Sequence, residues 1–179
     1  MKMVALLRGI NVGGNRKISM PQLVALAETC GFTEVKSYIN SGNIVFAVSK
    51  MNPKQAGTKL EKTIEAQFGF QADVIVRTAS QWKKYSTGSP FSSAETTRPK
   101  MLHLGLSKAT FKGDITPGLI EKAQYGEKIK VVGDAIWVDF CKSVGNSKLT
   151  PAIFDKAAGS TVTLRNWNTV LKLNEMLNK

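Results

Sequence analysis

The stretch KMVALLRGINVGGNRKISMPQLVALAETCG, residues 2–31, runs from a short apolar segment through a glycine-rich connection into an amphipathic pattern. The apolar segment is typical of a buried strand. Ser19 and Gln22 have the spacing of a capping box, with a proline in the first turn, and Gly31 is a natural helix stop. The stretch therefore predicts a β-α unit, and its connection, residues 8–19, poses the main functional question of this chain.

The rest of the first half extends this unit to the order β-α-β-β-α-β. Strands are predicted at 34–39 and 43–48, around a hairpin turn at Asn40-Ser41-Gly42. A second helix begins after Asn52 with the same capping pattern and is followed by a strand at 73–77. This order is that of a ferredoxin-like lobe, in which two helices cover one face of a four-stranded antiparallel sheet.

The second half repeats the pattern. Strands are predicted at 100–107, 128–132, 135–140 and 161–164, and helices at 116–123, 150–159 and 166–177. We therefore predict an α+β protein of two ferredoxin-like β-α-β-β-α-β lobes with antiparallel sheets and a C-terminal helix. The first lobe is expected at 1–88, a Ser-, Thr- and Pro-rich linker or loop at 89–99, and the second lobe at 100–179.

The chain is strongly basic, with a formal net charge of +12. Twelve basic and five acidic residues lie before residue 89, and thirteen basic and eight acidic residues follow, so the excess is spread over both halves. Such a charge favours polyanions and phosphorylated ligands. The predicted partners are nucleic acid or a phosphorylated small molecule.

Composition also argues against several classes of protein. The apolar runs are too short to span a bilayer, and the N-terminus has no small-residue cleavage site, so we expect a cytoplasmic protein without membrane contact. Cys30, Cys141 and the single histidine, His103, cannot supply a zinc site of the usual ligand types. No metal and no other cofactor is predicted. The two cysteines are expected as buried thiols and His103 as a strand-borne imidazole.

Catalytic motifs are missing. Ser80 and Lys83 match S-x-x-K, but no KTG or SDN motif accompanies them. Asp139 is the one carboxylate inside a strong strand pattern, and we expect it at an exposed strand position. The sequence therefore predicts no reaction and leaves open whether the protein is an enzyme.

The connection at 8–19 is a candidate anion site. Its glycines, which include Gly13 and Gly14, permit backbone N–H groups to point into one concavity, and Arg16 and Lys17 add positive charge before the helix start. The spacing is neither G-x-G-x-x-G nor a Walker loop. The alternative is a plain β-to-α connection with solvated basic side chains.

Two further segments carry candidate ligand-binding side chains. Ser41 and Asn43 open the third predicted strand, with a hairpin turn as the alternative role; Phe46 in that strand falls on the core side, which disfavours RNA recognition by aromatics on the sheet. Near the C-terminus, Arg165 suits bidentate phosphate binding, or else a salt bridge or a carbonyl clamp. Beside it, Asn166 and Asn168 are candidate ligand-facing donors, with a helix cap as the alternative role of Asn166, and Trp167 is expected in the core. This segment would share a cleft with residues 8–17 if the lobes face each other.

Three segments, LLRGINVGGNRKISM, YINSGNIVF and SVGNSKLTPAIFDKAAGSTVTLRNWNTVLKL, resemble the bacterial family called domain of unknown function 1697. The resemblance covers nearly the whole chain and implies a two-lobed α+β protein without an established activity. It draws attention to Arg8, Asn11, Gly13, Gly14, Asn15, Ser41, Gly42, Asn43, Arg165, Asn166, Trp167 and Asn168.

Three functional hypotheses follow from the sequence. The first is a binding module for a phosphorylated or polyanionic ligand, with nucleic acid the foremost class. The second is an enzyme that acts on a small phosphorylated metabolite without a metal, holding the phosphate with Arg8, Arg16, Lys17 and Arg165. The third is a protein-interaction module without a ligand. The oligomeric state is left open.

Overall fold

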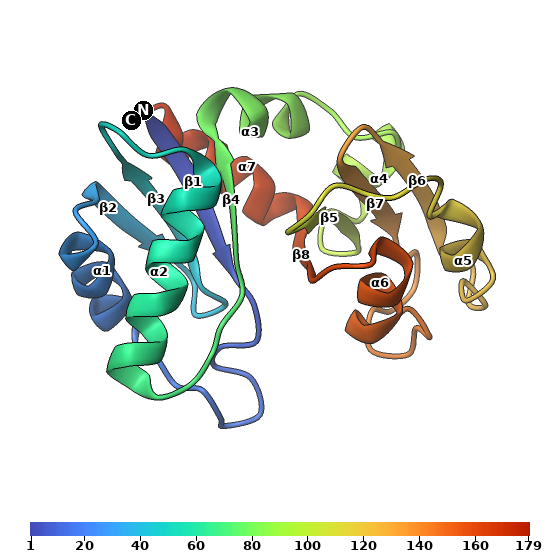
Figure 1. Cartoon of the computed structure of the whole chain (residues 1–179). Coiled ribbons are helices and arrows are strands. Elements are labelled where there is room, and N and C mark those ends of the chain that lie inside the picture. Colours follow the sequence, from blue (N-terminus) through green and yellow to red (C-terminus); the bar gives the residue numbers. More distant parts are fainter. The chain divides into compact units, whose positions relative to one another are not determined.

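The computed structural model describes residues 1–179, which divide into two compact units. The first unit contains Met1–Lys83 and Leu173–Lys179, and the second contains Lys84–Lys172. Each unit is built on one four-stranded antiparallel sheet with helices (Figure 1). The predicted fold class, two ferredoxin-like α+β lobes with a C-terminal helix, is confirmed. No helix combines the length and the hydropathy that a bilayer crossing needs.

The first unit has the predicted order of elements. They are β1 (Lys2–Leu7), α1 (Met20–Thr29), β2 (Thr33–Tyr38), β3 (Asn43–Ala47), α2 (Pro53–Phe68), β4 (Val74–Thr78) and α3 (Ala79–Ser86), of which α3 continues into the second unit. The strand order in the sheet is β2-β3-β1-β4. The core lies between this sheet and helices α1 and α2, and includes Met3, Ala5 and Leu7 of β1. These alternate positions share one face, as the period of a strand requires.

Local sequence fixes the helix starts. The Ser19 side chain accepts a hydrogen bond from the N–H of Gln22, and the Gln22 side chain accepts from the N–H of Ser19, which completes the predicted capping box. Asn52 and Gln55 form the same reciprocal pair at α2. Both predicted starts are confirmed, because the donors that a helix leaves unpaired find their acceptors within four residues.

The second unit repeats the topology with shorter helices. Its elements are α4 (Ser92–Thr97), β5 (Leu102–Ser107), α5 (Thr116–Ile120), β6 (Lys128–Val132), β7 (Ala135–Asp139), α6 (Pro151–Ala158), β8 (Val162–Asn166) and α7 (Trp167–Leu177). The strand order is β6-β7-β5-β8, the counterpart of the first sheet. Ile136 and Val138 of β7 pack with Leu119 and Phe154 of the covering helices. From Leu173 onward, α7 belongs to the first unit.

The segment 89–99, expected as a linker or loop, contains helix α4 and belongs to the second unit. Ala94 of this helix is buried, and the Glu95 side chain accepts a hydrogen bond from the N–H of Ser89. Serine and threonine are weak helix formers, so composition alone favoured a loop. Burial of Ala94 stabilises a short helix that local propensity does not predict.

The end of β1 and the β2–β3 hairpin approach each other closely at Gly42. The N–H of Leu7 donates to the Gly42 carbonyl over 2.8 Å. A Cβ at Gly42 would lie 2.8 Å from Leu7 Cβ and 2.7 Å from Ile10 Cδ1, and the φ of Gly42 is +77°. Only glycine satisfies both the backbone conformation and the available space.

Substitution Gly42→Ala should therefore lower the free energy of unfolding by about 2–4 kcal/mol, since overpacking adds to the strain of a positive φ. Urea denaturation of the full chain measures this loss. Gly13→Ala is the matched control, because Gly13 also has a positive φ (+60°) but open space around it. The control should lose only about 1–2 kcal/mol. Equal losses in the two variants would contradict the packing argument.

Candidate functional site

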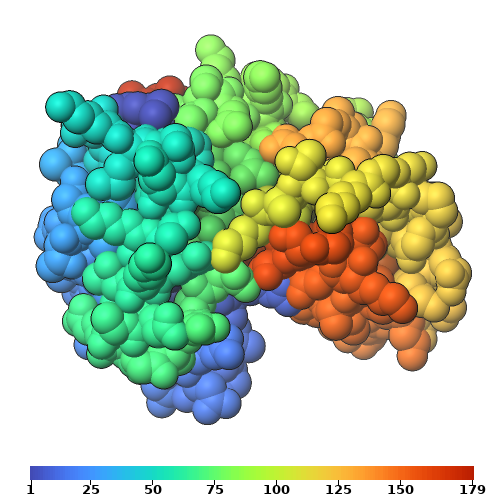
Figure 2. Space-filling model, in the orientation of Figure 1, coloured from blue at the N-terminus to red at the C-terminus, as the bar shows by residue number.

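The connection between β1 and α1 folds as a short hairpin of its own. The N–H of Asn11 donates to the Arg16 carbonyl over 3.2 Å, and the N–H of Asn15 donates to the Val12 carbonyl over 3.3 Å. The two residues between them, Gly13 and Gly14, have φ values of +60° and +79°, the pattern of a type I′ turn. Figure 2 shows this segment, in blue, projecting at the bottom of the first unit.

Asn11 ties this hairpin to its surroundings. Its Nδ2 donates to the carbonyl of Ile18 over 2.8 Å and to the carbonyl of Asn40 over 2.9 Å, while Oδ1 accepts from the N–H of Ile18 over 2.9 Å. The amide therefore joins both ends of the connection to the β2–β3 hairpin. Asn11 positions the loop, and its donors and acceptor are already engaged within the protein.

Many backbone donors of the connection are engaged in the same way. The N–H groups of Asn11, Asn15 and Ile18 are bonded within the loop, and the capping box occupies donors at the start of α1. The capacity of this loop for anions therefore lies mainly in its side chains rather than in a nest of free backbone N–H groups.

Arg16 and Lys17 are the cations that the hairpin presents. Both side chains are exposed, and neither forms an ion pair or a hydrogen bond. Arg16 has a φ of +51°, and its Nη1 would lie 3.4 Å from a Cβ at Gly9, so Gly9 leaves the guanidinium room to fold over the backbone. Arg8, at the start of the loop, is half-buried and donates its N–H to the Asp73 carbonyl over 2.9 Å.

An open groove of about 490 Å³ lies beside the hairpin. Its walls are formed by the connection, the first turn of α1 and the turn between β2 and β3: Asn11, Gly14, Lys17, Ile18, Ser19, Met20, Pro21 and Asn40. Five of these residues, Ile18, Ser19, Met20, Pro21 and Asn40, were not predicted as site residues, although Ile18 and Ser19 lie in the candidate connection at 8–19. Their sequence signals are those of a helix start and a turn, which say nothing about what lies across from them.

The Ser41-Gly42-Asn43 segment forms part of a hairpin turn, the alternative to a ligand-binding role. Asn43 is fully buried and donates from Nδ2 to the Tyr38 carbonyl over 2.9 Å and to Ser41 Oγ over 3.0 Å. These bonds stabilise the hairpin turn from inside. Next to it, Ile39 has a φ of +48° and is 47% exposed, an unusual conformation for a β-branched side chain.

The C-terminal candidates lie in the second unit, whereas residues 8–19 lie in the first. Arg165 is only 8% exposed, and its Nη1 donates to Thr163 Oγ1 over 2.7 Å and to the Leu164 carbonyl over 2.9 Å. Burial lowers the pKa of Arg165 to about 10. These contacts include the carbonyl clamp that was one alternative for this residue.

The residues after Arg165 begin helix α7. Asn166 Oδ1 accepts from the N–H of Thr169 over 3.0 Å, which is the helix cap expected as its alternative role. Trp167 is buried, as predicted, with its ring centroid 5.8 Å from that of Trp137. Asn168 is exposed. Arg165, Asn166 and Trp167 thus have structural contacts within the second unit.

Asp139 was expected at an exposed strand position, and this expectation is wrong. Its side chain is fully buried and accepts hydrogen bonds from Arg98 Nε over 2.9 Å, from Arg98 Nη2 over 2.6 Å and from the N–H of Cys141 over 2.9 Å. Burial opposes ionisation, but these hydrogen bonds outweigh it and hold the pKa of Asp139 below its ordinary value. Strand alternation does not reveal that Arg98, just after α4, covers this position.

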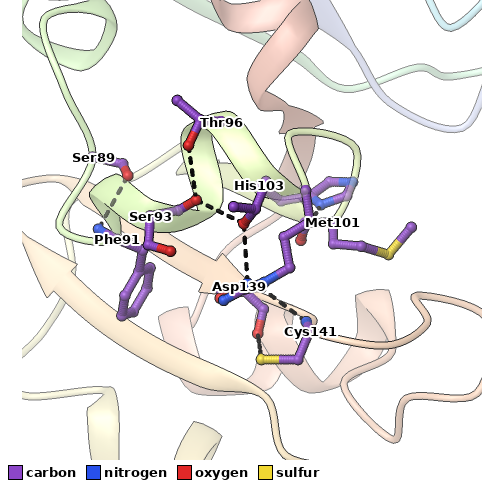
Figure 3. Close-up of polar contacts among 10 residues, drawn as sticks. Ser89, Phe91, Ser93, Thr96, Met101, His103, Asp139 and Cys141 are labelled. Atoms are coloured by element: carbon purple, nitrogen blue, oxygen red, sulfur yellow. Dashed lines mark hydrogen bonds and ion pairs between the residues drawn. The ribbon is translucent and has the colours of Figure 1, made fainter.

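Cys141 and His103 lie in the same region, shown in Figure 3, and neither has the properties of a reactive group. Cys141 is half-buried rather than buried, and burial together with the nearby Asp139 carboxylate raises its pKa, which disfavours a thiolate. His103 lies edge-on to Phe140 with Nδ1 3.2 Å from the Met101 carbonyl, and burial lowers its pKa. Cys30 is buried, as predicted.

Comparison with known proteins places the chain in a family. The family model described as a protein of unknown function (DUF1697) matches residues 1–137. The chain belongs to this family. The match includes the hairpin at 8–19 and the groove, whereas Arg165, Asn166 and Asn168 lie beyond it.

A solved structure supports the fold of this DUF1697 chain. The conserved bacterial protein SP0830 from Streptococcus pneumoniae is similar over 98% of both chains, with a TM-score of 0.71 and 23% sequence identity. At this identity the likeness concerns the fold alone. No curated protein matches the chain significantly.

The strain at Ile39 generates a prediction. Ile39→Asn should raise the free energy of unfolding by about 1 kcal/mol, because asparagine tolerates the left-handed region that costs a β-branched residue more. Urea denaturation measures the gain. Val12→Asn is the control: Val12 is 69% exposed and has no positive φ, so its stability should stay within about 0.5 kcal/mol of the wild type. A loss of stability in Ile39→Asn would refute the strain argument.

The Arg98–Asp139 pair should contribute to the stability of the second unit. Arg98→Ala should destabilise the protein clearly, because it leaves a buried carboxylate without its main partner. Lys122→Ala, which removes an exposed pair with Glu121, should have little effect in the same denaturation assay.

A pH titration of stability provides a separate check on this pair. Since the pKa of Asp139 is lowered from 3.8, its contribution is present above pH 3.8 and is lost as the pH falls through the folded-state value. In Asp139→Asn this acid-dependent loss should be smaller than in the wild type. An unchanged acid profile would contradict the assignment.

Proposed function

We propose that this protein binds a phosphorylated polyanion, with nucleic acid the foremost class, through the hairpin at 8–19 and the groove beside it. The observation that carries the proposal is the pair of exposed cations, Arg16 and Lys17, which have no acidic partner. Lys2, Arg98, Lys122 and Lys179 pair with carboxylates, whereas Lys59 and Lys62 are also unpaired but do not line the groove.

The surrounding structure supports this role. The hairpin is closed by its own backbone bonds and anchored by Asn11, so its cations are presented from a fixed backbone. A preformed loop loses less conformational entropy when a ligand binds. Lys17 also lines the groove, and the formal charge of +12 attracts polyanions from a distance.

Enzymatic activity on a phosphorylated metabolite is the less favoured hypothesis. An enzyme that acts on a phosphorylated metabolite would use the same cations but would also need a general base or a nucleophile. Cys141 favours the thiol form, and His103 is held against the Met101 carbonyl in the second unit. In the groove itself, Lys17 is assigned to the phosphate, and the Ser19 hydroxyl is held by Gln22 Oε1 in the capping box.

Binding is tested by fluorescence titration with labelled single-stranded RNA, single-stranded DNA and duplex DNA at about 50 and 200 mM salt. Wild-type affinity should fall steeply as salt rises, because each phosphate contact releases counterions. Arg16→Ala/Lys17→Ala should bind more weakly at about 50 mM salt. Its salt slope should be smaller by about 1.5, the equivalent of two lost contacts.

Lys59→Ala/Lys62→Ala is the matched control, since it removes the same charge from the exposed face of α2 in the same unit. It should retain nearly wild-type affinity. Equal weakening in both double variants would mean that net charge alone drives binding, and the hairpin would lose its assigned role. Absence of binding by the wild type at low salt would refute the proposed function.

A further inference from the structure

The groove beside the hairpin has a feature that phosphate binding does not use. Its lining includes Lys17, with Arg16 on the same hairpin, whereas the half-buried Met20 and the exposed Pro21 contribute apolar surface. A bare phosphate or polyphosphate would gain nothing from an apolar wall. The combination instead matches a ligand that has an anionic group and a flat apolar group close together.

We propose that the groove accepts the base of an unpaired nucleotide, so that the ligand is single-stranded nucleic acid; this inference rests on the proposed function. The volume of about 490 Å³ lies within the range of pockets that hold small ligands, about 300–1,000 Å³. The thioether of Met20 makes favourable contacts with aromatic rings, and the ring of Pro21 offers a rigid apolar surface. Unpaired bases are commonly held between aromatic or apolar side chains.

Asn40 supplies the polar group that a base edge requires. Its backbone carbonyl accepts from Asn11, but its side-chain amide is exposed and forms no hydrogen bond. A carboxamide offers both donors and acceptors, which suits the mixed edges of the bases. Asn11 fixes this part of the wall by its bonds to Ile18 and Asn40, so the amide of Asn40 projects from a supported backbone.

One alternative route to base stacking, through the aromatic ring of Phe46 in β3, is closed. Phe46, the only aromatic residue of β3, is buried and stacks on Phe32 with ring centroids 4.3 Å apart. Its predicted place in the core is confirmed, so β3 presents no aromatic residue on an open sheet face. In a duplex the faces of the bases are covered by their neighbours, and the apolar wall of the groove would have no partner. A single strand can place its phosphates near Lys17 and an unpaired base against the apolar surface of the groove.

The test compares two labelled strands of about 12 nucleotides, one of oligothymidine and one abasic, with the same number of phosphates. Fluorescence anisotropy with the full chain at about 50 mM salt should show at least about fivefold tighter binding of the intact strand, the lower end of what one stacked base contributes. Pro21→Ser/Asn40→Ala should reduce this preference at least threefold and leave the affinity for the abasic strand unchanged. Both positions are exposed, so the fold should tolerate the changes.

The outcomes separate this inference from the proposed function. Equal affinity for the intact and abasic strands would overturn the base-binding role and leave polyanion binding by Arg16 and Lys17 in place. Tighter binding of a duplex of the same length would also overturn it. If neither strand binds, the proposed function fails and this inference fails with it. Arg16→Ala/Lys17→Ala should weaken both strands alike, whereas Lys59→Ala/Lys62→Ala should change neither.

Discussion

The close approach of β1 to the β2–β3 hairpin at Gly42 sets the geometry of the first unit. The N–H of Leu7 donates to the Gly42 carbonyl over 2.8 Å, and the space between these two segments leaves no room for a Cβ at Gly42. This contact brings the chain that leaves β1 next to the turn that precedes β3. Asn11 then bonds across the junction to the Asn40 carbonyl, and the loop at 8–19 is held in one place. The groove and its lining follow from this junction.

The electrostatic character of the site depends on which charges remain unpaired. Arg98 is paired with the buried carboxylate of Asp139, so its charge stabilises the second unit. Arg165 is buried, with its guanidinium bonded to Thr163 and Leu164. Arg16 and Lys17 have no such contacts and stand on a hairpin that its own backbone keeps closed. Free cations on a supported loop are suited to an external anion, because binding breaks no existing pair.

The two units share a topology but differ at the corresponding connection. In the first unit, β1 leads into a twelve-residue hairpin loop and a ten-residue helix with a capping box, whereas in the second unit β5 leads into the five-residue helix α5, which has no side-chain cap. The features assembled at the groove, a type I′ turn, an anchoring asparagine and adjacent cations, belong to the first unit. The same fold therefore carries a candidate site in one lobe without repeating it in the other, because the site depends on loop chemistry rather than on the sheet.

The sequence by itself determined the elements and most of the core. Capping boxes at Ser19 and Asn52, and the inward positions of Phe46 and Trp167, could be predicted because each depends on residues a few positions apart or on a simple period. Tertiary structure alone decided the burial of Asp139, the anchoring role of Asn11 and the apolar wall of the groove. These depend on partners far along the chain, such as Arg98 for Asp139 at a separation of 41 residues and Asn40 for Asn11 at 29. Local periodicity carries no information about such partners, since only the packed sheet brings them within hydrogen-bond distance.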